Sequence, residues 1–147
     1  MIQLLFKIIL YVHVLSAVVS IGPLFALLII VKQMSSAENS ILEGYVRSFQ
    51  AGITAVKHAG HVVVLSGILL IWLSGWPWHA SWVVLTVVLM VGSIVFLASA
   101  FKPTIKTFGT EHFIKEEFVK KLHRATWQYI LILLIMLWLM VNKPMFW

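Results

Sequence analysis

The chain contains no cysteine and no aspartate, and charged residues of any kind are scarce. Without cysteine it can form no disulfide, thiolate metal cluster or cysteine nucleophile. Only 11% of the 147 residues are charged, against about 25% in ordinary soluble domains. Glycine-rich phosphate loops, nucleophile elbows and metalloprotease motifs are also missing. These absences exclude the common soluble enzyme classes, and the 61% content of hydrophobic residues indicates a membrane protein.

Four apolar runs approach or exceed the ~20 residues that a helix needs to cross ~30 Å of hydrocarbon. They cover residues 4–31, 51–73, 82–101 and 125–141. The first run is too long for a secretory signal peptide and lacks a small-residue cleavage site, so we expect it to remain as the first helix. Because only short segments separate the runs, the sequence predicts an all-α fold, an up-down bundle of four transmembrane helices that forms one domain over residues 1–147.

The placement of basic residues predicts the orientation. Of the 11 lysines and arginines, all except Lys7 and Lys143 fall in or beside the segments after the first and third runs. Cytoplasmic loops carry such an excess, so both termini are expected outside a bacterial cytoplasmic membrane, with the basic loops against anionic lipid. A nucleic-acid partner is not expected, because no basic soluble face with interleaved aromatic residues is present.

Both basic loops carry signs of helix. Ser40 and Glu43 have capping-box spacing, which predicts that the second helix begins near Ser40, ahead of the lipid. In both loops apolar residues recur every fourth position just before the next apolar run, as on one face of a helix. These stripes are Ile41, Tyr45 and Phe49 before the second run, and Ile114, Phe118 and Leu122 before the fourth.

Tryptophan gathers at the opposite, outer turn. The residues concerned are Trp72, Trp76, Trp78 and Trp82. Indole rings favour the headgroup level, so we interpret this cluster as an interfacial anchor. The alternative is that the rings form the floor of a quinone or lipid site.

The chain has six histidines, and they are its main candidates for chemistry. His79 and His112 fall in loops, where we expect them to be solvated. The other four lie within or at the edge of the apolar runs: His13, His58, His61 and His123. An ionisable side chain at such a depth is costly, which makes it a functional-site hypothesis by default.

Imidazoles on facing helices of a bundle are a usual way to hold haem. The ligand is a neutral imidazole whose second ring nitrogen needs a hydrogen-bond partner, such as a serine or a backbone carbonyl. We therefore predict a haem b site with His13 and His61, the most deeply placed, as iron ligands. Along the helices these two lie on different sides of the bilayer midplane, so one shared iron requires a tilted or shifted span.

Two other features complete the haem hypothesis. His58 and His123 are better matched in depth, near the cytoplasmic boundary, and stay as alternative ligands. Lys57 and Arg124, at the same level, are candidates to pair with the haem propionates. The competing interpretation is that these histidines only form interhelical hydrogen bonds.

The first helix, from Phe6 and Lys7 through His13 to Gly22-Pro23-Leu24-Phe25, resembles the opening helix of the HemJ-type protoporphyrinogen oxidases. In that family a histidine within the span is followed at similar distance by a Gly-Leu-Phe turn. The helix is equally similar to small integral-membrane families related to HemJ and to the copper-resistance CopD proteins. The resemblance implies that His13 corresponds to a haem-ligating histidine. HemJ-type enzymes also use a lysine in a later span, and residues 82–101 contain none, which argues against the oxidase activity itself.

The leading hypothesis is a membrane-embedded b-type haem protein that acts in electron transfer or in haem or tetrapyrrole handling. The alternative is a non-enzymatic assembly factor or accessory subunit of a respiratory complex. Besides the lipid bilayer, the candidate partners are a quinone, a respiratory complex and a second copy of the chain. Copper handling is disfavoured because the methionines are scattered. A transporter is disfavoured because no acid lies within the spans. Whether the protein is an enzyme stays open.

Overall fold

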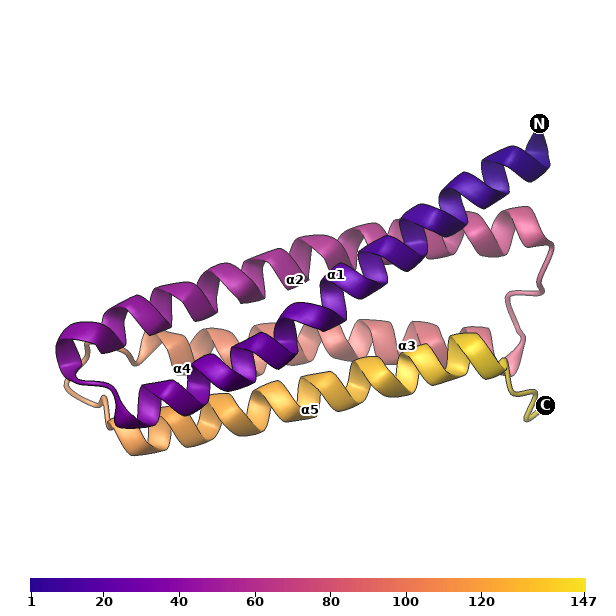
Figure 1. Ribbon diagram of the computed structural model, residues 1–147. Helices are drawn as coiled ribbons and strands as arrows, with labels where there is room; N and C mark the ends of the chain where they lie inside the picture. The colour runs from indigo at the N-terminus through magenta and orange to yellow at the C-terminus, as the bar shows by residue number, and fades with distance from the viewer.

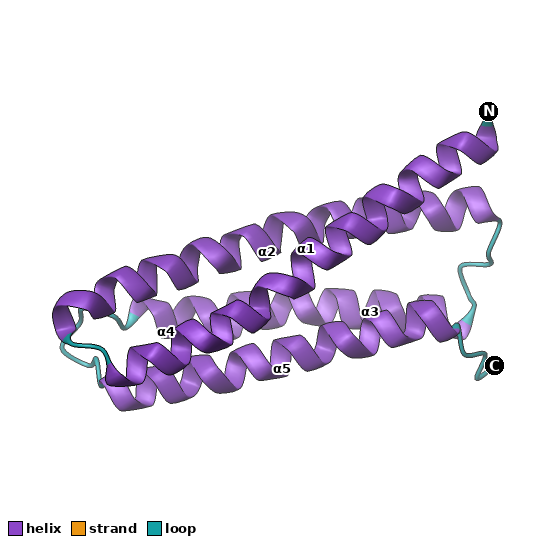
Figure 2. Ribbon diagram, viewed as in Figure 1, coloured by secondary structure: helices purple, strands orange, loops and turns teal.

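The computed structural model describes all 147 residues and contains helices and loops but no strand (Figures 1 and 2). Its elements are α1 (Ile2–Ser36), α2 (Asn39–Ser74), α3 (Ser81–Phe96), the π-helical turn η1 (Leu97–Phe101), α4 (Lys102–Lys106) and α5 (Lys115–Asn142). α3, η1 and α4 form one continuous helix, and the four resulting helices are each long and apolar enough to cross a membrane. The predicted all-α, four-span fold is confirmed.

The helices run up and down, with both termini at the same end of the molecule (Figure 1). α1 packs against α2 and α5, and α3 packs against α5. The last turns of α1 lie beside the first turns of α5, whereas the N-terminal half of α1 diverges from α5 and follows α2 (Figure 1). The bundle is therefore tightest at the end where α1 connects to α2, and at the other end α1 has mainly α2 as a neighbour.

The core lies toward the tight end and is rich in aromatic rings. Phe49 of α2, Phe101 of η1 and Tyr129 of α5 are buried, with ring centroids 5.9 Å apart for Phe49–Phe101 and 6.0 Å for Phe101–Tyr129. Phe96 stacks on Tyr129 at 6.1 Å. The π-helical turn ends two residues before Pro103, which has no N–H and whose ring crowds the preceding turn, so we attribute the widened turn to this proline.

The start of the second helix is partly as predicted. α2 begins at Asn39 and includes residues 41–49, which confirms the extension. The capping box at Ser40 is wrong: the N-cap is Glu38, whose backbone carbonyl accepts from the N–H groups of Ile41 and Leu42 at 3.0 and 2.9 Å. Only Ala37 and Glu38 connect α1 to α2, so the tight reversal, rather than a serine side chain, sets where the helix starts.

The two predicted apolar stripes differ in how far they are buried. Before the second span only Phe49 of its stripe is fully buried, because the buried face runs through Leu42 and Val46 instead. Before the fourth span Phe118 and Leu122 are buried in the core, whereas Ile114 is exposed as the N-cap of α5.

At the end of the bundle that holds both termini, the C-terminal tail is attached to the start of α3. The Ser81 hydroxyl donates to the Pro144 carbonyl and accepts from the Phe146 N–H, both at 2.8 Å. The Lys143 ammonium lies 5.3 Å from the Trp76 ring centroid and 5.7 Å from that of Trp82. Trp72 and Trp78 are exposed, as expected of interfacial anchors, whereas Trp82 is buried and belongs to this tail contact.

Gly52 of α2 lies directly against the Leu27 side chain of α1. A Cβ atom at this position would lie 2.6 Å from Cδ2 of Leu27, whose side chain is buried. We expect Gly52→Ala to destabilise the protein by about 1–3 kcal/mol because the added methyl overpacks this contact. Thermal unfolding in detergent measures the effect. Gly44→Ala is the matched control, because a Cβ there meets nothing within 4 Å and alanine favours the helix; equal stability of the two variants would contradict the close contact.

Candidate functional site

His13 lies at the contact between α1 and α2 and is half-buried. Its Nδ1 atom is 3.0 Å from the backbone oxygen of Val63 and 2.9 Å from Oγ of Ser66. Gly67 faces the same ring: a Cβ there would lie 3.2 Å from Cε1 and 3.7 Å from Nδ1 of His13. The imidazole is thus held in a notch of α2 made by a carbonyl, a hydroxyl and a glycine.

This arrangement fixes the tautomer of His13. A carbonyl oxygen can only accept, so Nδ1 carries the hydrogen that points at Val63. The Ser66 hydroxyl donates its own hydrogen to the carbonyl of Val62 at 2.6 Å. Its oxygen can therefore accept the Nδ1 hydrogen of His13 together with the Val63 carbonyl. In the neutral ring, Nε2 is then unprotonated and carries a free lone pair.

Nε2 has no hydrogen-bond partner in the protein. Because Nε1 of Trp82 is the only fully buried side-chain nitrogen or oxygen without a partner, Nε2 of His13 is not fully buried. An imidazole oriented through Nδ1 by a backbone carbonyl, with Nε2 free, is the arrangement that metal-ligating histidines use.

The structure does not bring His61 to His13. Residues of a helix are about 100° apart, so His61 points nearly opposite to Val63, Ser66 and Gly67, which face α1. His61 is exposed, and its nearest recorded imidazole is that of exposed His58, with ring centroids 6.1 Å apart. His58 and His61, three residues apart, share one face of α2, and that face is turned away from α1.

The remaining predicted site residues lie apart from the notch. Lys57 is exposed on the same outward face of α2 as His61, and His123 and Arg124 are exposed near the start of α5. His79 and His112 lie in exposed turns, as expected. No group of three or more histidine, cysteine or acidic side chains is close enough together to hold a metal ion. The only histidine rings that lie close together are those of His58 and His61, so the structure brings no second imidazole to His13.

The outward face of α2 has an unusual composition for a helix in a membrane protein. Toward the start of α2 this face is polar, and it then continues as Leu65, Ile68 and Trp72. The polar members, all exposed, are Gln50, Thr54, Lys57, His58 and His61. At about 1.5 Å per residue, His61 lies about 20 Å along α2 from its end at Ser74, within the length that a helix needs to cross ~30 Å of hydrocarbon.

Sequence reasoning anticipated a serine or a carbonyl as the partner of His13 but did not identify Val63, Ser66 or Gly67. Two small residues, Ser66 and Gly67, next to each other on a membrane helix were the available signal, because small residues mark close helix contacts. The lysines that line a cavity between α1 and α5 were predicted to lie in basic loops against anionic lipid, but the cavity itself was not predicted. They are described below.

No protein-family model, curated protein or solved structure matches this chain. The function is therefore proposed from the residues of the site themselves.

Proposed function

We propose that this protein is a membrane-embedded b-type haem protein in which His13 is the axial ligand of the iron, acting in electron transfer or in haem or tetrapyrrole handling. The observation that carries the proposal is the Nδ1 hydrogen bond of His13 to the Val63 carbonyl, 3.0 Å long, which leaves the lone pair of Nε2 free to bind the iron. Haem bound there supplies a one-electron redox centre whose potential depends on the axial ligand and its hydrogen bonds.

Each residue of the notch has a distinct task in this proposal. The Val63 carbonyl and the Ser66 hydroxyl orient the ring and raise the basicity of Nε2. Gly67 leaves the space that the ring edge fills. The nearby groove between α1, α2 and α5 measures about 30 Å³, room for about one water molecule, so it does not accommodate a tetrapyrrole. A haem ligated by Nε2 would therefore lie on the surface of the bundle, against the exposed part of the half-buried His13.

We place the protein in the bacterial cytoplasmic membrane with both termini outside. The support is the concentration of lysine and arginine at the tight end of the bundle, which the positive-inside rule assigns to the cytoplasm. His13 then lies in the outer half of the membrane, about 9 Å along α1 from Lys7.

The optical spectrum of the purified protein tests this function. Protein made with ample haem supply is expected to show a Soret band that shifts on reduction by dithionite. Since the structure brings no second imidazole to His13, the reduced protein is also expected to bind carbon monoxide, with a second shift of the band. A colourless protein under these conditions would refute the haem assignment.

A second candidate function, accessory subunit of a larger membrane complex, is favoured by the polar outward face of α2. Ionisable side chains within a membrane almost always face protein or a water-filled cavity, yet Lys57, His58 and His61 face outward in the single chain. A photo-crosslinking residue at position 61 tests this. The control position is Leu134, which is exposed and apolar. Crosslinks to a protein of defined mass at position 61, together with crosslinks to lipid alone at position 134, would support the accessory-subunit function. Crosslinks to lipid alone at both positions would contradict it.

A further inference from the structure

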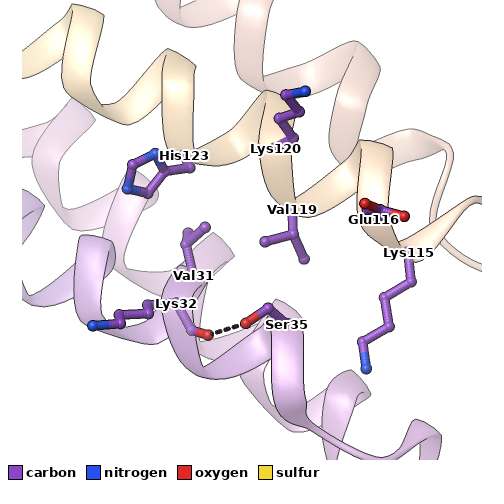
Figure 3. Close-up of a pocket in the computed structure, with 8 residues that line it drawn as sticks. All are labelled: Val31, Lys32, Ser35, Lys115, Glu116, Val119, Lys120 and His123. Atoms are coloured by element: carbon purple, nitrogen blue, oxygen red, sulfur yellow. Dashed lines mark hydrogen bonds between the residues drawn. The ribbon is translucent and has the colours of Figure 1, made fainter.

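A cavity lies between the end of α1 and the beginning of α5, at the tight end of the bundle. Its volume is about 600 Å³, and it is open to the surface. Val31, Lys32 and Ser35 line it from α1, and Lys115, Glu116, Val119, Lys120 and His123 line it from α5. Figure 3 shows the two helices facing each other across it, with Val31 and Val119 between them. Lys32 and His123 lie toward one end and Lys115 toward the other, and the Lys120 side chain extends from α5 on the side away from α1.

The rim carries positive charge that the protein does not neutralise. Three lysines surround the cavity against one carboxylate, Glu116. The only salt bridge in the structure, Glu43–Arg47, is elsewhere, on α2. Lys115 donates to the carbonyl of Ala37, which lies in the connection between α1 and α2. This hydrogen bond holds the Lys115 side chain against that connection. Lys32 and Lys120 have no acidic partner, so the cavity is suited to an anion.

The depth of the cavity indicates which anion. Val31 is the last residue of the apolar run that begins α1, and His123 comes just before the run that begins at Ala125. Both walls therefore reach the membrane boundary at the same level. One turn further along α5, Trp127 is exposed, as indole rings are at the headgroup level. The apolar floor of Val31 and Val119 below a basic rim matches a phosphate headgroup above an acyl chain.

We infer that this cavity binds the phosphate headgroup of an anionic phospholipid, held by Lys32, Lys120 and His123. Basic pockets between transmembrane helices on the cytoplasmic side recognise such headgroups. The site lies near the opposite end of α1 from His13, so the inference goes beyond the proposed haem function and does not depend on it.

Native mass spectrometry of the purified full-length protein in neutral detergent tests the inference. Phosphatidylglycerol, phosphatidylcholine and inorganic phosphate are added separately, and adducts are counted. We expect preferential retention of phosphatidylglycerol, and a loss of affinity of about tenfold or more in the double variant Lys32→Gln, Lys120→Gln. Both lysines are exposed and glutamine keeps most of the side chain, so the fold is expected to persist.

The matched control removes two exposed lysines outside the cavity, in Lys102→Gln, Lys106→Gln, and is expected to bind phosphatidylglycerol like the unmodified protein. Equal affinity in the cavity variant and the unmodified protein would overturn the inference. So would an equal loss in the control variant, because the effect would then be one of net charge. Binding of inorganic phosphate without lipid would assign the cavity to a soluble phosphate compound and refute the lipid assignment.

Discussion

Replacing His13 by alanine is expected to abolish haem binding while the protein still inserts into the membrane and stays monodisperse. If His13 ligates the iron, as proposed, loss of its imidazole removes the iron–protein bond. The folding cost is small because no polar group of α2 is stranded: the Ser66 hydroxyl keeps its contacts with the carbonyls of Val62 and Val63 at 2.6 and 3.1 Å. An interhelical hydrogen bond in a membrane contributes only about 0.6 kcal/mol on average.

The haem content of each variant, measured per mole of protein after purification, checks this expectation. His79→Ala and His112→Ala are the matched controls, because both histidines lie in exposed turns, and they should keep the spectrum of the unmodified protein. Loss of haem in His61→Ala, His58→Ala or His123→Ala, with full haem content in His13→Ala, would move the ligand assignment to those residues. Full haem content in all four would rule out histidine ligation of this kind.

Gly67→Val is expected to lower haem content several-fold, although the substitution removes no polar side chain. An added Cβ alone would lie 3.2 Å from Cε1 of His13, a closer contact than such atoms usually make. Two hydrogen bonds hold the ring at Nδ1, so it cannot move aside and keep them, and the two further methyl groups of valine increase the overlap. The ring then rotates or α1 separates from α2, and in either case Nε2 is displaced.

Gly60→Val is the control for this substitution. Gly60 lies on the same helix, and a Cβ there meets nothing within 4 Å. Both variants replace a glycine of α2 by the same β-branched residue, so they share any general effect on the helix. Equal haem content in the two variants would show that the notch around His13 does not position the ligand.

Much of the fold was predictable from the sequence because lipid imposes simple requirements on it. Apolar runs of membrane length must be helices, since the bilayer offers no partner for backbone N–H and C=O groups. Short connections then force neighbouring helices to run antiparallel. The start of α2 was placed near Ser40 on a side-chain motif, whereas the two-residue connection at Ala37 and Glu38 governs it. The π turn of residues 97–101 was not foreseen, although Pro103 gives it a cause.

The site was less predictable, because it depends on how the helices are aligned along one another. The sequence identified His13 as an ionisable group at membrane depth and required a partner for it, but the choice of Val63 and Ser66 follows from the packing of α1 on α2. The expected pairing with His61 required that histidine to face α1. Its neighbours Val63 and Ser66 face α1 instead, and helical geometry then turns His61 outward.

Coordination of iron by Nε2 of His13 is the central claim, and resonance Raman spectroscopy of the reduced, haem-loaded protein tests it most directly. An iron–histidine stretching band that shifts on iron isotope substitution is expected, as is its absence from His13→Ala incubated with the same haem. The same band, unchanged in frequency and intensity in His13→Ala, would contradict the assignment.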